Sequence, residues 1–256
     1  MSADLVERLP QLSFAFVLLL ARIGSLCMLL PGIGEAEVPA RIRLGFALAI
    51  ALVLLPVIAP LVPSADLSAW ATCRLVMLEL MVGLWLGWLT RLWVLALPMA
   101  GQVVATATGL ANVLQPDPAL GPQTSAISRA LALAAPTVIL ATGLYRPPLA
   151  ALAGSYRVFA PGMTFPAGAS TQFVVELLGS TLAMSVQLAT PFLVGGLIWH
   201  SACGLLARLI PQLQVFFAAL PGQILLGFAA LSLLASLMVE NWTARVADAF
   251  AALPGL

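Results

Sequence analysis

Long apolar runs, separated by short polar or proline-rich segments, are the main pattern along this chain. They predict six helices, at about residues 12–30, 44–62, 69–97, 127–144, 173–210 and 213–239. Because about 20 apolar residues cross the hydrocarbon core of a bilayer, each run is long enough, or nearly so, for a transmembrane helix. The run 173–210 is almost twice that length, so we expect a kinked or tilted helix that extends beyond the membrane. The predicted fold class is an all-α integral membrane protein with about six long apolar helices.

Two stretches do not fit this pattern. Residues 98–128 are rich in Gly, Thr, Gln and Pro, which makes them too polar to face lipid, yet they lack the charge of a solvated loop. Residues 146–170 form a connector rich in Pro and Gly. Polar or non-helical backbone is tolerated at membrane depth only against protein or a water-filled cavity. We therefore expect the 98–128 region to line such a cavity.

Composition agrees with a membrane environment. Hydrophobic residues make up 62% of the chain and charged residues 8%, whereas a soluble domain usually has about 25% charged residues. The eleven basic residues are all Arg and are balanced by ten acids, so no basic patch for nucleic acid is expected. Acidic residues precede the first run and Arg22 interrupts it, so we expect that segment to be retained and not cleaved as a signal. Arginines occur on both sides of the alternating loops, which leaves the membrane orientation open.

The sequence offers no support for catalysis. The three cysteines, Cys27, Cys73 and Cys203, are isolated, and we expect them to be buried spectators without a disulfide or metal. His200 is the only histidine, and an interfacial or interhelical hydrogen bond is its favoured role. Zinc-protease, phosphate-loop, dinucleotide and serine-hydrolase motifs are absent from the sequence. The prediction is no enzyme activity, no cofactor and no metal.

Among the ionisable residues within the apolar runs are Arg22, Glu79, Arg91 and Glu176. Such residues are costly in a membrane and are functional candidates by default. One hypothesis makes Glu79 or Glu176 a proton carrier. The favoured hypothesis is structural, with each acid paired to an arginine on a neighbouring helix or subunit, because a relay needs more than scattered single acids. Arg74 lies about 140° around the helix from Glu79, so those two are not expected to pair.

Small residues and prolines within the runs indicate close packing against protein. Gly83 and Gly87 form a GxxxG spacing, which allows two helix backbones to approach. Pro136 and Pro191 each leave a carbonyl without its helical donor. Helix interiors of this kind are better tolerated in a packed assembly than in a helix surrounded by lipid.

Several strings along the chain are distinctive: Phe16–Gly24, Leu30–Glu35, Val38–Ala49 and Gly204–Pro221. Between them lie Gly101-Gln102, Gly109-Leu110 and Asp117-Pro118. In this order, the first set resembles the beginning and the C-terminal motif of the FliR family, export-gate proteins of the flagellar type III secretion system, and the second set is similar to the central region of that family. The resemblance covers essentially the whole chain.

The resemblance implies an architecture and a set of partners. A FliP-like helical portion would cover residues 1–170 and a FliQ-like helical hairpin residues 171–256, in kinked hairpins with no separate soluble domain. The hairpin turn would include Arg208, Pro211, Gln212 and Pro221. The implied partners are FliP- and FliQ-like subunits, FlhB- and FlhA-like export components, membrane lipid and unfolded protein substrates. The implied location is the bacterial inner membrane, within the flagellar basal body, and the energy for export would come from elsewhere.

The family also implies a plug that closes the export channel. It maps onto residues 106–118, within which the candidates are Leu110, Asn112, Val113, Leu114 and Gln115. Related proteins often have aromatic residues there, and this chain does not. We expect Leu110, Val113 and Leu114 to form an apolar constriction that excludes water, with Asn112 or Gln115 hydrogen-bonding across a narrow pore.

Other functions remain open from the sequence. The same architecture would serve the equivalent subunit of a virulence injectisome. A secondary transporter would require matching halves with discontinuous helices, and the sequence shows no such symmetry. An intramembrane enzyme is the least favoured class. In the export-gate interpretation, much of the apolar surface would contact other subunits and not lipid.

Overall fold

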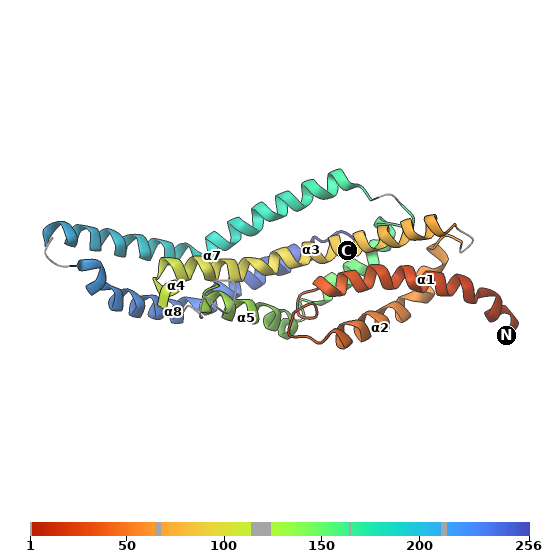
Figure 1. Cartoon of the computed structure of the whole chain (residues 1–256), viewed down its shortest axis with the longest axis horizontal. Helices are drawn as coiled ribbons and strands as arrows, with labels where there is room; N and C mark the ends of the chain where they lie inside the picture. Colours follow the sequence, from red (N-terminus) through yellow and green to blue (C-terminus); the bar gives the residue numbers. More distant parts are fainter. Residues whose placement is uncertain (1, 65–67, 114–123, 164, 211–213) are drawn as a thin grey trace. The chain divides into compact units, whose positions relative to one another are not determined.

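The chain is almost entirely helical. The computed structural model describes residues 2–64, 68–113, 124–163, 165–210 and 214–256, and within these ranges it contains helices and no strand. The all-α prediction is confirmed. The elements, shown in Figure 1, are α1 (Ser2–Leu29), α2 (Ala40–Ile58), the short 3-10 helix η1 (Ala59–Leu61), α3 (Ala69–Ala107), α4 (Leu110–Val113), α5 (Ala126–Thr142), α6 (Arg146–Val158), α7 (Ala167–Leu209) and α8 (Val215–Ala251).

Most of the long helices have the length and composition of membrane spans. Five segments are each long and apolar enough to cross a membrane. The number rises to six if α5 and α6 are counted together as one broken span. The five are Arg8–Leu29, Ala40–Leu61, Ala69–Ala107, Ser170–Leu209 and Val215–Ala251. The prediction of about six long apolar helices is therefore confirmed.

The helix ends differ from the predicted ones in two informative places. α3 continues through Pro98 to Ala107, so the first part of the 98–128 region is helical, contrary to expectation. α6 occupies half of the predicted 146–170 connector. Its prolines lie in its first turn, where the missing N–H is not needed for helical hydrogen bonding. A proline-rich sequence was compatible with a helix there because of the position of the prolines.

The chain forms two compact units, both discontinuous in sequence. Unit 1 comprises residues 1–93, 139–177 and 247–256, and unit 2 comprises residues 94–138 and 178–246. α3, α5, α7 and α8 each contribute residues to both. These units differ from the FliP-like portion (1–170) and the FliQ-like portion (171–256) that the resemblance implies, because each unit combines separate stretches of the chain. The FliP-like and FliQ-like portions stay a prediction.

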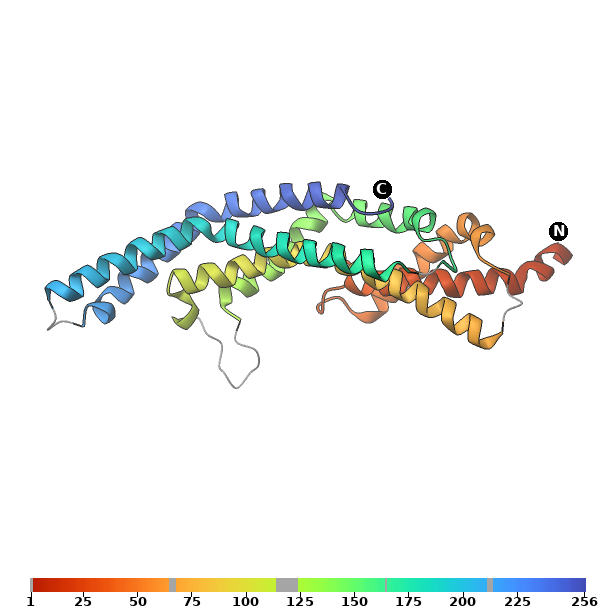
Figure 2. The ribbon, with the colours of Figure 1, turned by 90° about the horizontal axis from the view of Figure 1, so that it is seen from above.

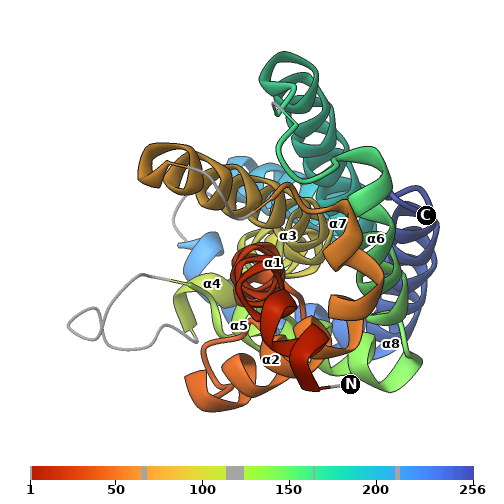
Figure 3. The ribbon, with the colours of Figure 1, turned by 90° about the vertical axis from the view of Figure 1, so that its right-hand side faces the viewer.

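Unit 1 has a broad core built around α1. α1 lies beside α2 in Figures 1 and 3, and Leu152 and Tyr156 of α6 belong to the same core. The predicted close approach of α3 is confirmed, because a Cβ on Gly83 would lie 2.1 Å from the carbonyl oxygen of Arg22, and one on Gly87 would lie 2.8 Å from the Cβ of Leu29. Buried members of this core include Leu18, Leu19, Ile23, Leu26, Leu30, Val82, Leu86 and Leu152.

Unit 2 has buried apolar residues and a large exposed apolar surface. One buried cluster consists of Ala105, Leu110 and Ile127, against which Ile224 and Leu231 of α8 are partly buried. The unit 2 portions of α7 and α8 run side by side (Figure 2). Their outward side chains are mostly apolar and exposed, including Leu197, Leu209, Phe217, Leu225 and Leu233. This unit therefore leaves much apolar surface for lipid or partner subunits to cover.

Candidate functional sites

Arg22 of α1 and Glu79 of α3 form a buried ion pair in unit 1. The Nε of Arg22 lies 2.6 Å from Oε2 of Glu79, and its Nη2 lies 3.0 Å from Oε1. The side chains are 1% and 2% exposed. Two parallel bonds between a guanidinium and a carboxylate are the strongest arrangement that such a pair can adopt.

The rest of the Arg22 guanidinium is satisfied by α6. Its Nη1 donates to Oγ of Ser155 at 3.2 Å, and its Nη2 donates to the carbonyl oxygen of Phe159 at 2.8 Å. The guanidinium carbon also lies 4.0 Å from the ring centroid of Tyr156, at cation–π distance. A buried ion pair is tolerable when such further bonds offset its desolvation. Arg22 thus links α1, α3 and the end of α6.

This geometry favours the structural hypothesis for Glu79 over the proton-carrier hypothesis. Both carboxylate oxygens accept hydrogen bonds from Arg22. To accept a proton, this carboxylate would have to give up a bond from Arg22. We therefore interpret Glu79 as a fixed partner of Arg22.

The other two intramembrane charges differ from this pair. Arg91 of α3 makes a two-bond ion pair with Glu35, with side chains 26% and 13% exposed. Glu176 of α7 is exposed and accepts a hydrogen bond from Nε2 of Gln172, one turn earlier on the same helix, at 3.1 Å. Glu79 therefore has the expected arginine partner, and Arg91 is paired with an acid. The bond described for Glu176 is instead to an amide.

The start of the predicted plug is a tight turn in unit 2. α3 ends at Ala107, and Oγ1 of Thr108 donates to the carbonyl oxygen of Val104 at 2.8 Å. Gly109 has φ +74°, a left-handed conformation that only glycine adopts readily, as is common just after a helix end. Leu110 then begins the short helix α4 and has no exposed surface.

Glycines of α7 and α8 contact this turn closely. A Cβ on Gly196 would lie 2.7 Å from the carbonyl oxygen of Ala107, and a Cβ on Gly227 would lie 2.8 Å from the Cβ of Thr108. The side chain of Gln223 packs on Gly109, where a Cβ would meet its Nε2 at 2.9 Å. The turn is therefore held between two helices that come much later in the sequence.

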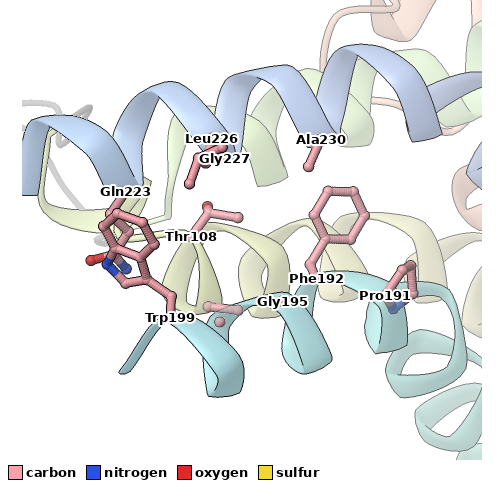
Figure 4. Close-up of a pocket in the computed structure, with 11 residues that line it drawn as sticks. Thr108, Pro191, Phe192, Gly195, Trp199, Gln223, Leu226, Gly227 and Ala230 are labelled. Atoms are coloured by element: carbon pink, nitrogen blue, oxygen red, sulfur yellow. The ribbon is translucent and has the colours of Figure 1, made fainter. Parts of the chain in front are cut away.

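A cavity of about 260 Å³ lies beside the same turn. Figure 4 shows Thr108 between α7 and α8, with Trp199 and Gln223 near one end of the cavity and Phe192 and Ala230 near the other. The lining is predominantly apolar, and Thr108 and Gln223 are its polar side chains. Residues on all three helices thus surround an unfilled space next to the turn.

The predicted plug residues are only partly described. Leu110 packs in the core of unit 2, so in this conformation it anchors the turn and does not line an exposed constriction. Asn112 and Val113 belong to α4 by their backbone, and Leu114 and Gln115 lie outside the described residues.

The predicted hairpin turn is narrower than expected. Arg208 lies in the last turn of α7, and Pro221 lies inside α8. Pro211 and Gln212 lie outside the described residues. Pro221 is the seventh residue of α8, so it leaves the carbonyl oxygen of Phe217 without its helical donor.

Two sequence predictions about isolated polar residues need correction. His200 makes a hydrogen bond within α7, between Nδ1 and the carbonyl oxygen of Gly196 at 2.7 Å. That bond does not match the interhelical alternative, and the interfacial alternative stays a prediction. Cys27 and Cys203 are buried as expected, but Cys73 is exposed. All three thiols are free.

Sequence reasoning missed the partners that complete the buried charges. Glu35 was noted only as part of a family-like string, and Ser155, Tyr156 and Phe159 were placed in a connector. A signal existed for Glu35, since an acid after Pro-Gly at the end of an apolar run is unusual. For the α6 residues, only the fold brings them to Arg22.

Comparison with known proteins identifies the family. The family described as Bacterial export proteins, family 1, matches residues 13–249. The chain is 32% identical to flagellar biosynthetic protein FliR of Caulobacter vibrioides over 91% of this chain and 92% of the relative. It is 28% identical to FliR of Bacillus subtilis (85% and 84% covered) and 28% identical to Yop proteins translocation protein T of Yersinia pestis (86% and 84% covered). The expected resemblance is confirmed, and this chain belongs to the Bacterial export proteins, family 1.

Proposed function

We propose that this protein is a core subunit of a type III protein export gate. The observation that carries the proposal is the family match over residues 13–249, with relatives named for flagellar biosynthesis and for Yop translocation. The exposed apolar faces of α7 and α8 support it, since a subunit of a membrane assembly needs such surfaces. In this role the protein forms, with other subunits, a passive channel for unfolded flagellar proteins.

The partners in this proposal are FliP- and FliQ-like subunits, with FlhB- and FlhA-like components nearby. Residues 1–170 would take the place of a FliP-like portion and residues 171–256 that of a FliQ-like hairpin. The fact that α7 and α8 are long, adjacent helices joined by a short segment is compatible with the second assignment. The assembly would lie in the bacterial inner membrane, at the flagellar basal body.

The plug in this proposal is the 106–118 segment, which follows the turn at Thr108 and Gly109. Leu110 would anchor it from inside unit 2, and the residues after Leu110 would close the channel. Deleting Leu110–Leu114 should make the assembled gate leak ions when no substrate is exported. An unchanged conductance would exclude the plug assignment.

Co-purification tests the function as a whole. A tagged version expressed with FliP- and FliQ-like proteins should be extracted in detergent as a complex with both. Motility and secretion of flagellar proteins should be lost when the gene is deleted and restored by the tagged version. Purification without either partner, or unaffected motility, would contradict the proposal.

A second candidate is the equivalent subunit of a virulence injectisome. The identity to the Yersinia translocation protein favours it, because that relative matches nearly the same share of the chain as FliR of Bacillus subtilis does. Deletion would then abolish secretion of effector proteins and leave swimming intact. The higher identity to FliR of Caulobacter vibrioides favours the flagellar candidate.

A further inference from the structure

Gly196 of α7 and Gly227 of α8, which we call the glycine seat, hold the turn at the end of α3. Both contacts involve atoms that cannot move easily, namely the carbonyl oxygen of Ala107 and the Cβ of Thr108. Glycine within a helix is less favourable than alanine. Its presence at both positions is explained by the close approach of the turn.

Neighbouring glycines show that this requirement is local. A Cβ on Gly195 or on Gly204 would meet no atom within 4 Å. Both residues lie in α7, as Gly196 does. The seat is therefore set by the contact with α3 and does not reflect a general preference for small residues along this helix.

Further contacts fix the turn to α8. Gln223 packs on Gly109, and Leu110 is buried in a cluster that Ile224 and Leu231 extend. The cavity next to Thr108 leaves about 260 Å³ into which side chains can shift. The turn is thus held at a few points and has unfilled space beside it, so its position should respond to a single added methyl group.

We propose that the glycine seat sets the position of the turn formed by residues 107–110 and thereby holds the export channel closed. This inference rests on the proposed export-gate function, because the turn matters only if the 106–118 segment closes a channel. Gly196 and Gly227 act as positioning residues in it. An alanine at either position pushes the turn away from α7 or α8, and closure becomes less complete.

The test is the ion leak of the assembled gate with Gly196→Ala or Gly227→Ala, compared with Gly195→Ala and Gly204→Ala. Each seat variant should still co-purify with its partners and should raise the leak by about tenfold, as expected if overpacking shifts the open-to-closed ratio. The two control variants should behave as the unaltered protein does. An unaltered leak in both seat variants, or an equal rise in the controls, would overturn the proposal.

A second substitution can show whether Gly227→Ala acts by shifting the turn or by destabilising the whole protein. Thr108→Gly removes the Cβ that Gly227→Ala would meet, so the double variant should leak less than Gly227→Ala alone. If the seat variants fail to co-purify with their partners, Gln223→Ala replaces them in the test, because it adds no atoms and removes the contact with Gly109. Gln223→Ala should raise the ion leak of an intact complex. An unchanged leak would contradict the proposed role of the glycine seat.

Deleting Leu110–Leu114 distinguishes this inference from the proposed function. A leak on deletion without a leak in any seat variant would reject the seat and leave the export-gate function standing. Absence of a complex with FliP- and FliQ-like partners in the unaltered protein would reject the function itself.

Discussion

Units 1 and 2 differ in the kind of side chain that they enclose. Unit 1 encloses a charged pair, Arg22 and Glu79, inside a broad apolar core. Unit 2 encloses apolar side chains such as Phe192 and Trp242, and it exposes the outer faces of α7 and α8. Unit 1 therefore depends on the pairing of its enclosed charges, whereas the exposed faces of unit 2 need lipid or other subunits to cover them.

The largest effect should come from breaking the buried ion pair. Glu79→Leu leaves the Arg22 guanidinium without its carboxylate partner, and loss of one partner of a buried pair costs about 3–5 kcal/mol. The thermal midpoint of the purified protein in detergent should fall sharply. Arg74→Met is the matched control, because Arg74 is on the same helix and exposed.

The double variant Arg22→Met, Glu79→Leu tests whether the loss of stability comes from the unpaired charge of Arg22. Removing both charges leaves apolar side chains in an apolar core, which is often neutral for stability. It should therefore melt well above Glu79→Leu alone. A double variant as unstable as the single one would mean that the charges themselves, and not their pairing, hold unit 1 together.

The second-largest loss of stability should come from disturbing the close contact between α1 and α3 in unit 1. Gly83→Ala would place a methyl group 2.0 Å from Oγ of Ser25 and 2.1 Å from the carbonyl oxygen of Arg22. Overpacking of this kind costs about 1–3 kcal/mol. In contrast, Gly45→Ala in α2 meets no atom within 4 Å and should be neutral or stabilising by up to about 1 kcal/mol. Equal midpoints for the two variants would contradict the close approach of α1 and α3.

Sequence patterns predicted the middles of the helices better than their ends. Apolar length is visible in sequence, but α3 continues for a further stretch that contains Gln102 and Thr106. The hydroxyl of Thr106 donates to the carbonyl oxygens of Gln102 and Val103 within the helix, so a polar side chain there does not interrupt it. Polarity alone therefore gave the wrong end for α3.

Pairing between distant residues was beyond sequence reasoning. Arg22 and Glu79 were each recognised as costly, but they are 57 positions apart, and their contact depends on how α1 packs on α3. The glycine seat is similar, because Gly196 gains its meaning only from the carbonyl oxygen of Ala107. Single residues could be marked as candidates from sequence, and the fold was needed to join them.

A smaller effect is expected at the partly buried pair of Arg91 and Glu35. Glu35→Gln keeps the shape and removes the charge, and the cost should lie between the about 1 kcal/mol of an exposed pair and the about 3–5 kcal/mol of a fully buried one. The loss should shrink as salt is raised, because salt screens such pairs. Glu37→Gln, two residues along and exposed, serves as the control. A loss at Glu35 as large as that at Glu79 would contradict the expected difference between fully buried and partly buried charges in unit 1.

The smallest effect on the isolated chain should come from the exposed face of unit 2. Leu233 of α8 is 75% exposed, whereas Met238 on the same helix is 4% exposed. Leu233→Ser should change stability in detergent by about 0.5 kcal/mol or less, as surface substitutions do, and Met238→Ser should cost clearly more.

In the assembled gate the order of these two variants should reverse for partner binding. If other subunits cover α8, Leu233→Ser removes apolar surface from that contact and should lower the yield of co-purified FliP- and FliQ-like partners. The isolated chain would be almost unchanged, which separates loss of a contact from loss of folding. If instead the yield of partners is unaffected at Leu233 and at Leu225, which is 71% exposed, this face of α8 meets lipid. Unit 2 would then depend on the bilayer, and not on neighbouring subunits, to cover the apolar side chains that it exposes.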